Sequence, residues 1–281
     1  MTSERYRLIS VVSLEEQMVD RILFGPFSKV ELRKCLTIPG KSGWSPLPMG
    51  FKVFESQFQH CLATDCTAFD WTFPSWASKL LCELYIDMLI APSAKYVLAF
   101  RNRWSQIMDR SIIRLPDGTR LMQEQPGMMK SGWYRTIAVN SAAQVLIHDL
   151  AALRAGLSRP PLKWTMGDDV VLSWPPEQPE AAFNKALETT GILVKQSERE
   201  AMFAGFRFSP GMVTPLYPAK HLFMLRHVNS TLAAEVADSY MLMYALVAPQ
   251  DALAQRVKRA IVERTTITSR YARSWALGLW Q

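Results

Sequence analysis

The feature that most constrains the fold is a Gly167-Asp168-Asp169 tripeptide between two apolar runs, 162–166 and 170–174. A glycine followed by aspartates between such runs predicts a tight β-hairpin with acidic residues at its tip. Like charges about 4 Å apart repel by roughly 1 kcal/mol even in water. A divalent cation would offset this repulsion, and oxygen ligands without histidine or thiolate neighbours favour Mg²⁺ or Mn²⁺. The alternative is a solvated turn, because this tripeptide is common in loops.

Hydrophobic periodicity predicts strands and helices on both sides of this hairpin. Near the N-terminus, 8–12 is predicted to be a short strand that leads into a helix with one apolar face, made of Leu14, Met18, Ile22 and Leu23. Further strands are predicted at 61–64, in a hairpin over 114–122, at 192–195, and at 203–208 paired with 212–216. Helices are predicted after Pro74, from Gly132 to about Arg154, over 180–190, and through most of 218–281. This order predicts an α+β fold, an antiparallel sheet with helices on one face.

Composition and charge exclude some classes of protein. Of the 281 residues, 49% are hydrophobic, so intrinsic disorder is excluded as the main description. The formal net charge of +7 weakly indicates a polyanionic partner. The N-terminus lacks an apolar leader, and charged residues and a proline interrupt the stretch 80–100, so neither a signal peptide nor a transmembrane segment is expected. The four cysteines lack metal-binding spacing and are expected to be reduced thiols.

Four motifs that carry chemistry follow one another in a fixed order. Asp65 and Asp70 come after the strand at 61–64, and Ser131-Gly132-x3-Thr136-x3-Asn140 opens a helix. The Gly167-Asp168-Asp169 hairpin follows, and Lys195 comes after a helix–glycine–strand unit. This order resembles motifs A to D of viral RNA-directed RNA polymerases. The run 5–10 resembles the end of motif F, and 203–208 resembles motif E. The runs 6–26, 69–72 and 129–132 are most similar to sobemovirus, polerovirus and barnavirus polymerases.

The resemblance implies a right-hand polymerase palm with partial fingers and a small helical thumb. Residues 1–60 would be residual fingers with the end of motif F. Residues 61–217 would be the palm, with motifs A to E and an interleaved fingers segment, and 218–281 would be the thumb. Polymerases of this kind normally have a long fingers region ahead of motif F, so the chain is expected to be a fragment or a reduced member that uses fingers supplied elsewhere.

The activity implied is template-directed RNA synthesis, for replication and transcription of a positive-strand viral RNA genome. A 3′-hydroxyl attacks the α-phosphate of a nucleoside triphosphate in line, with two metal ions stabilising the developing charge. In the family pattern, Asp65 and Asp168 would hold two Mg²⁺ or Mn²⁺ ions. Asp169 would support the same metal site.

Other residues receive roles from the same resemblance. The ribose 2′-hydroxyl would be read by Asp70, Ser131 and Asn140, with Gly132 and Thr136 in the same block. Arg5 and Arg7 would hold the triphosphate. Lys195 would donate a proton to the leaving pyrophosphate, and a solvated strand-end lysine is an equal alternative. Arg207 and Lys220 would contact the RNA backbone.

The implied partners are an RNA template, the nascent RNA, nucleoside triphosphates and other viral replication proteins. The implied location is the cytoplasm of a host cell, in a viral replication complex with peripheral membrane attachment as an option. Two alternatives stay open. One is a catalytically weak, polymerase-derived RNA-binding protein or fragment. The other is a reverse transcriptase, although that class usually has a bulky aromatic residue where Asp70 stands.

Overall fold

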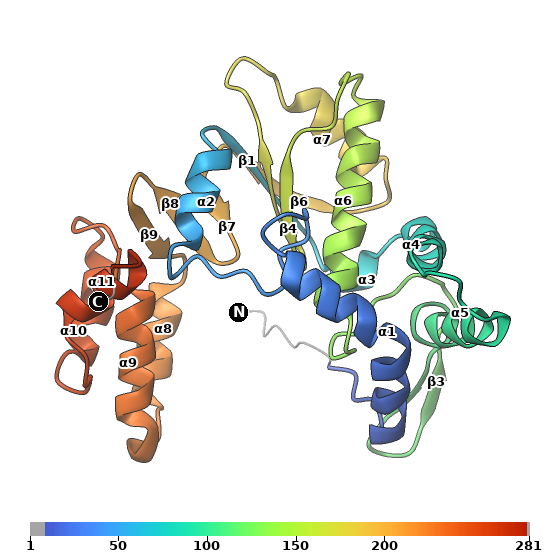
Figure 1. The fold of residues 1–281 in the computed structure, drawn as a ribbon, viewed down its shortest axis with the longest axis horizontal. Helices are drawn as coiled ribbons and strands as arrows, with labels where there is room; N and C mark the ends of the chain where they lie inside the picture. The colour runs from blue at the N-terminus through green and yellow to red at the C-terminus, as the bar shows by residue number, and fades with distance from the viewer. Residues whose placement is uncertain (1–8, 280–281) are drawn as a thin grey trace. The chain divides into compact units, whose positions relative to one another are not determined.

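The structure, a computed structural model, describes residues 9–279, so Arg5 and Arg7 lie outside the described residues. The chain divides into two compact units. The first contains residues 1–43, 64–170 and 176–197, and the second contains 44–63, 171–175 and 198–281. Figure 1 shows the order of the elements. The division into fingers, palm and thumb at residues 60 and 217 stays a prediction.

Helix α1 (Leu14–Lys34) begins at a capping box, in which Ser13 and Glu16 bond each other's backbone N–H groups. Its buried face carries Asp20, Leu23 and Phe24. Of the apolar face predicted for this helix, only Leu23 is buried, and the others are exposed. The predicted strand over 8–12 is wrong for residues 9–12, which form no strand. The physical reason is that this segment joins no sheet: Ser10 N–H donates to the Ser131 carbonyl at 2.7 Å.

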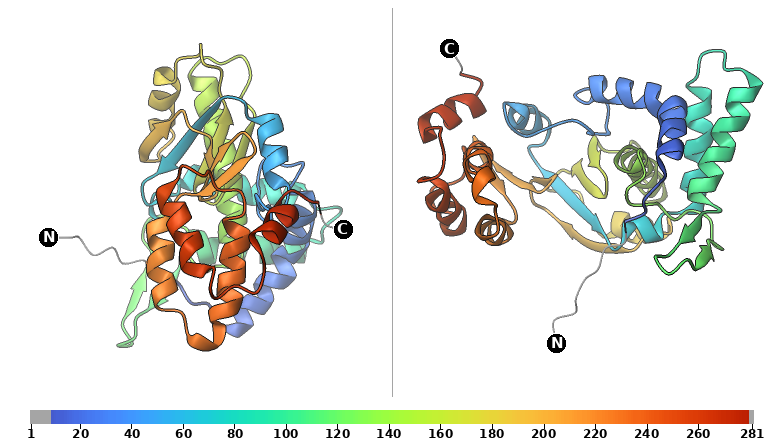
Figure 2. Two further views of the ribbon diagram at one scale, coloured as in Figure 1. Left: turned by 90° about the vertical axis from the view of Figure 1, so that its left-hand side faces the viewer. Right: turned by 90° about the horizontal axis from the view of Figure 1, so that it is seen from below.

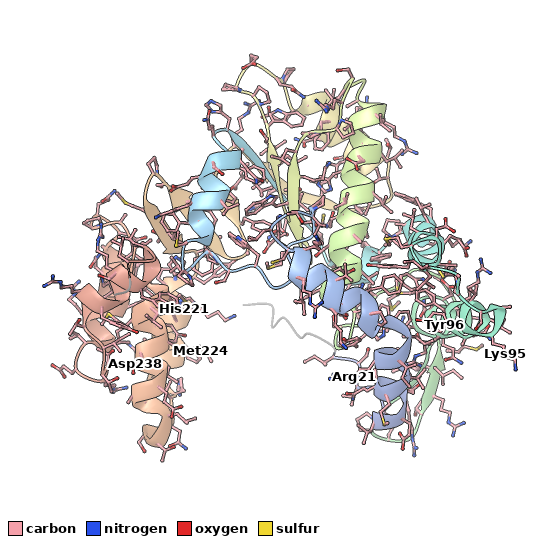
Figure 3. All side chains as sticks on the ribbon, in the orientation of Figure 1. Arg21, Lys95, Tyr96, His221, Met224 and Asp238 are labelled. Carbon is pink, nitrogen blue, oxygen red and sulfur yellow. The ribbon has the colours of Figure 1, made fainter. Side chains whose placement is uncertain are left out.

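Aromatic packing connects α1 to its neighbours in the first unit. Phe24 meets Phe100 edge to face at a centroid distance of 4.7 Å and Trp133 at 5.4 Å. Phe100 lies on α5 (Ala94–Met108), which follows α4 (Ser75–Asp87). The Tyr96 hydroxyl of α5, labelled in Figure 3, donates to the Leu23 carbonyl at 2.6 Å. The predicted hairpin is confirmed as β2 (Ile112–Arg114) paired antiparallel with β3 (Arg120–Met122).

A four-stranded sheet has the order β4-β5-β1-β6. Its strands are β4 (Lys163–Met166), β5 (Asp169–Ser173), β1 (Cys61–Cys66) and β6 (Val194–Glu198). Strands β4 and β5 are neighbours joined at Gly167 and Asp168, which confirms the predicted hairpin. Helix α6 (Thr136–Arg154) packs against β4 and against α7 (Ala181–Glu188) (Figure 1). The α+β class predicted from the sequence is confirmed.

In the second unit, a three-stranded sheet and α2 (Gly50–Gln57) share an aromatic core, in which Phe54 stacks on Phe208 at 4.1 Å. The sheet has the order β7-β8-β9. These strands are β7 (Met202–Phe203), β8 (Phe206–Ser209) and β9 (Met212–Pro215). The predicted helical tail forms α8 (Pro218–Arg226), the short 3₁₀ helix η1 (Ser230–Leu232), α9 (Ala233–Met243), α10 (Ala252–Ile261) and α11 (Ser269–Ala276). Helix α10 contacts α8 and α9, and α11 contacts α9 (Figure 2).

Helix α6 has the length and apolar composition of a membrane span, and within residues 9–279 it alone passes that test. Half of its most apolar window is buried inside the protein. The same helix carries Asn140, Gln144 and His148, all buried and all hydrogen-bonded within the first unit. These contacts place α6 in the protein core.

Candidate active site

The three aspartates predicted to bind metal lie on neighbouring strands of one sheet, or in the turn that joins them, in the first unit. Asp65 lies in β1, Asp168 in the turn before β5, and Asp169 is the first residue of β5, the neighbour of β1 in the sheet. More than a third of the surface of Asp169 is exposed, but desolvation of its carboxyl group by the surrounding protein, followed by repulsion from Asp168 and Asp65, raises the pKa of Asp169 to about 6. Asp168 is the neighbour of Asp169 in sequence, and Asp65 lies on the adjacent strand of the sheet.

The turn that carries Asp168 depends on its glycine. Gly167 has φ of +66°, a left-handed backbone conformation that glycine adopts without steric cost. Its N–H donates to Ser141 Oγ at 2.9 Å. The turn is therefore fixed both by its own backbone and by a side chain of α6.

Lys195 lies beside Asp65, as the order of strands β1 and β6 requires. Its Nζ atom is 2.5 Å from Asp65 Oδ2. The side chains keep 51% and 32% of their surface exposed, so this ion pair is open to solvent. The structure brings the predicted proton donor to the predicted metal ligand, with the ammonium group in the role of a counter-cation.

Asp70 lies at the centre of a polar cluster made of the residues predicted to read ribose. Asn140 Nδ2 donates to Asp70 Oδ1 at 2.8 Å, and Ser131 Oγ donates to Asp70 Oδ2. Asn140 Oδ1 is buried without a hydrogen-bond partner among residues 9–279. Asp70 keeps only acceptor groups, so a hydroxyl donor from a substrate is the chemistry that this cluster fits.

Gly132 and Thr136 shape the loop that presents Ser131. Gly132 has φ of +103°, and a Cβ atom there would lie 2.5 Å from the Ser10 carbonyl oxygen. Thr136 Oγ1 donates to the carbonyls of Lys130 and Trp133, both at 2.9 Å. The side chain of Lys130 is buried against Gln123 and the Met128 carbonyl. The contacts of Gly132 and Thr136 are with the loop backbone and with Ser10.

Arg207 and Lys220 belong to the second unit. Arg207 pairs with Glu200 at 3.1 Å through side chains that are about half exposed. Lys220 is an exposed residue of α8, next to His221, whose Nδ1 lies 2.7 Å from the Tyr244 hydroxyl (Figure 3). The role of both cations in RNA binding stays a prediction.

Sequence reasoning missed three polar side chains of α6 that contact β1 or the Gly167-Asp168 turn, the segments that carry Asp65 and Asp168. Ser141 contacts the turn, Gln144 Nε2 lies 3.5 Å from Cys66 Sγ, and His148 Nε2 lies 2.9 Å from the Thr64 hydroxyl. Burial lowers the pKa of His148 to about 4. A sequence signal existed for Gln144 and His148, which stand with Asn140 at four-residue spacing in a mostly apolar helix and so share one face. No such spacing marks Ser141.

The donor set suits a hard divalent cation, because it consists of carboxylate oxygens near one another. Repulsion from Asp168 and Asp65 adds to desolvation in raising the pKa of Asp169, and a bound cation would offset that repulsion. Within the described residues, however, no group of three histidine, cysteine, aspartate or glutamate side chains is gathered tightly enough to form a ready ligand set. The Lys195 ammonium group contacts one of the Asp65 oxygens, so a metal ion would have to displace it to bind at that atom.

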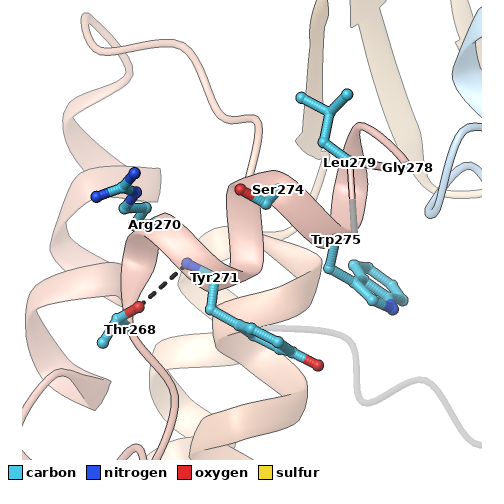
Figure 4. Close-up of a pocket in the computed structure, with 7 residues that line it drawn as sticks. All are labelled: Thr268, Arg270, Tyr271, Ser274, Trp275, Gly278 and Leu279. Carbon is cyan, nitrogen blue, oxygen red and sulfur yellow. Dashed lines mark hydrogen bonds between the residues drawn. The ribbon is translucent and has the colours of Figure 1, made fainter. Parts of the chain in front are cut away.

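A shallow pocket in the second unit lies along α11 (Figure 4). Tyr271, Ser274, Trp275 and Leu279 are among the residues that line it. Among the described residues that line it, none is acidic, so they offer no carboxylate for metal-assisted chemistry.

Comparison with solved structures defines the class of fold. The chain matches crystal structures of the RNA-dependent RNA polymerase of a human picorbirnavirus with a TM-score of 0.69 and 14% identity. One of these is an insertion loop deletion mutant, and the match to it covers 95% of this chain and 55% of that chain. At this identity the match shows the fold, which is that of a viral RNA-dependent RNA polymerase.

Comparison of sequences then shows the family. The profile described as "Viral RNA-directed RNA-polymerase" matches residues 1–208, so this chain belongs to the family of viral RNA-directed RNA polymerases. The replicase polyprotein P2AB of Southern bean mosaic virus is 36% identical over 177 residues, which cover 60% of this chain and 18% of that polyprotein. Protein P1-P2 of Potato leafroll virus is 30% identical over 244 residues, which cover 79% of this chain and 21% of that protein. The predicted resemblance to sobemovirus and polerovirus replicases is confirmed. The chain spans about a fifth of the length of these two relatives.

Proposed function

We propose that this chain is the palm-containing part of a replicase that synthesises RNA on an RNA template of a positive-strand plant virus. The single observation that carries the proposal is that strand β1, which holds Asp65, lies beside strand β5, which begins at Asp169 directly after Asp168, although these segments are far apart in the chain. Family membership supports the reaction class, and plant-virus relatives support the host cell as the location.

In this proposal the chain's own residues orient the reacting groups. Asp65, Asp168 and Asp169 would hold two Mg²⁺ or Mn²⁺ ions, which supply stabilisation of negative charge on the attacking and leaving oxygens when bound. Asp70 accepts hydrogen bonds from Ser131 and Asn140, and this cluster would accept the 2′-hydroxyl of a ribonucleotide. Lys195 would release Asp65 and hold a proton near the pyrophosphate.

Sequence resemblance supports further contacts. Arg5 and Arg7 would bind the triphosphate, and Arg207 and Lys220 would bind the RNA backbone. The palm, partial fingers and thumb would be arranged as the family resemblance implies. Other replication proteins of the virus would act with this chain in a replication complex.

Primer extension on an RNA template with Mn²⁺ tests the proposal. We expect the chain to incorporate ribonucleotides in preference to deoxyribonucleotides, and Asp168→Ala to abolish most of the activity. Asp117→Ala is the matched control, because Asp117 is an exposed aspartate at the tip of the hairpin β2–β3. A preference for deoxyribonucleotides would indicate a reverse transcriptase. RNA binding without extension would indicate a non-catalytic RNA-binding protein.

A further inference from the structure

We propose that Ser141, helped by Gln144, is a positioning residue that holds the Gly167-Asp168 turn in the conformation required for metal binding. The inference rests on the proposed function, since it concerns how the aspartates are presented. Neither residue belongs to the predicted set of catalytic, ribose-binding or RNA-binding residues.

Ser141 makes three hydrogen bonds that connect α6 to the β4–β5 hairpin and to its own helix. Its Oγ accepts from Gly167 N–H at 2.9 Å, and its carbonyl accepts from Thr165 Oγ1 at 2.9 Å. The same Oγ donates to the Ile137 carbonyl at 2.7 Å, which directs its lone pairs toward Gly167. Ser141 is 1% exposed, so water cannot replace these bonds.

Gln144 lies one helical turn further on and reaches the next residue of the hairpin. Its Nε2 donates to the Asp168 carbonyl at 3.4 Å, a long bond, and lies 3.5 Å from Cys66 Sγ on β1. One amide group therefore contacts both β1, which carries Asp65, and the turn that carries Asp168. Burial is the main cause that raises the pKa of the Cys66 thiol to about 11, so this contact involves a neutral thiol.

Stability alone does not explain a glutamine at this place. Gln144 is fully buried, and its Oε1 has no hydrogen-bond partner in the described part of the chain. A buried acceptor without a partner is unfavourable, and an apolar residue of similar volume would avoid that penalty. The polar side chain is explained by its contacts with Asp168 and Cys66.

The two contacts have a direct consequence for Asp168. Gly167 adopts a left-handed conformation, and its N–H donates to Ser141, while the carbonyl of Asp168 accepts from Gln144. These groups belong to the peptide units before Gly167 and after Asp168, so both ends of the two-residue turn are anchored, which limits the direction in which the Asp168 side chain leaves the backbone. Mutation of residues that orient metal ligands through hydrogen bonds typically lowers metal affinity or activity by 10–100-fold.

The test compares Ser141→Ala, Ser141→Thr and the control Ser239→Ala. Ser239 is also a helical serine that donates to the carbonyl four residues earlier, at 2.9 Å, but it lies on α9. Three quantities are measured: Mn²⁺ affinity by electron paramagnetic resonance, melting temperature in EDTA, and kcat and KM for ribonucleotide incorporation. Gln144→Met provides a second variant, which removes the other contact between α6 and the Gly167-Asp168 turn.

We expect Ser141→Ala to remain folded, with Mn²⁺ affinity and kcat each about tenfold lower and KM for the nucleotide nearly unchanged. Ser141→Thr, which keeps the hydroxyl, should restore most of the loss, and Ser239→Ala should behave as the unaltered chain. Mn²⁺ affinity and kcat within twofold of the unaltered chain in both Ser141→Ala and Gln144→Met would overturn the inference. If Mn²⁺ affinity depends on Ser141 while the unaltered chain incorporates no ribonucleotide, the inference stands and the proposed function fails.

Discussion

The Nζ atom of Lys195 lies 2.5 Å from Asp65 Oδ2, so the predicted proton donor forms an ion pair with a predicted metal ligand. The pair joins the neighbouring strands β6 and β1. Because a bound metal ion and the lysine would compete for the same oxygen, their binding should be mutually exclusive at that atom.

Replacing Lys195 by Gln should therefore separate metal binding from turnover. We expect Mn²⁺ affinity to rise severalfold, because a competing cation is removed, while kcat falls. The melting temperature should change by less than about 2 °C, since exposed ion pairs contribute roughly 0–1 kcal/mol. Lys185→Gln, at an exposed position of α7, is the control. Weaker Mn²⁺ binding by the Lys195 variant would contradict this competition.

Discrimination between ribose and deoxyribose should depend on Asn140. Removal of its amide leaves Asp70 Oδ1 without one donor. Hydrogen bonds to charged groups contribute about 1.5–3 kcal/mol, so Asn140→Ala should lower the ratio of kcat/KM for CTP over dCTP by about 10–100-fold. Ile137→Ala, at a position of α6 that is 56% exposed, should leave the ratio unchanged. If the CTP/dCTP ratio of kcat/KM is unchanged in Asn140→Ala, Asn140 does not take part in ribose recognition.

Asp169 should make the fold less stable as pH rises. Its folded-state pKa of about 6 lies above the ordinary value of 3.8, so its contribution is most favourable below pH 3.8 and is lost as pH rises toward 6. Asp169→Asn should raise the melting temperature in EDTA at pH 7.5, by about 1–2 °C because the residue is solvent-exposed. The difference in melting temperature between the Asp169→Asn variant and the unaltered chain should be smaller at pH 5. An equal or lower melting temperature of the variant at pH 7.5 would contradict the raised pKa.

His148 should make the fold less stable as pH falls. Its folded-state pKa of about 4 lies below the ordinary value of 6.5, so its contribution is complete above pH 6.5 and is lost as pH falls toward 4. For this fully buried side chain the loss should be on the order of 3 kcal/mol in the free energy of unfolding. Urea unfolding between pH 7 and 4.5 would measure it. His148→Gln should show a shallower acid dependence, and an identical slope would exclude His148 as the source.

Local sequence signals predicted much of the fold. The two hairpins around Gly118 and Gly167 and helix α6 follow from turn chemistry and helical periodicity, which act within a few residues. Helix α1 shows a feature that such local signals do not predict, namely which of its residues are buried. The pattern predicted one apolar face made of Leu14, Met18, Ile22 and Leu23, but only Leu23 of this face is buried. Asp20 is buried instead, where it pairs with Arg103 at 2.7 Å. That partner lies on α5 and cannot be located from the local pattern.

The candidate site was predictable in its residues but not in its contacts. The family resemblance implied that Asp70, Ser131 and Asn140 act together, and the structure shows Ser131 and Asn140 hydrogen-bonded to Asp70; their role in reading ribose stays a prediction. The roles of Ser141 and Gln144 depend on which atoms of the β4–β5 turn face α6, and the sequence does not show this. The pairing of Lys195 with Asp65 depends on strand order, which became visible only in the sheet.

Double-mutant analysis of Asp65 and Asp168 tests most directly whether these carboxylates form one catalytic centre. Primer extension is measured for Asp65→Asn, Asp168→Asn, the double variant and the control Asp117→Asn. Residues that act as a unit are strongly non-additive, so we predict that each single variant loses at least about a thousandfold in kcat and the double variant loses little more. Single variants with near-normal kcat, or losses that multiply in the double variant, would contradict the account.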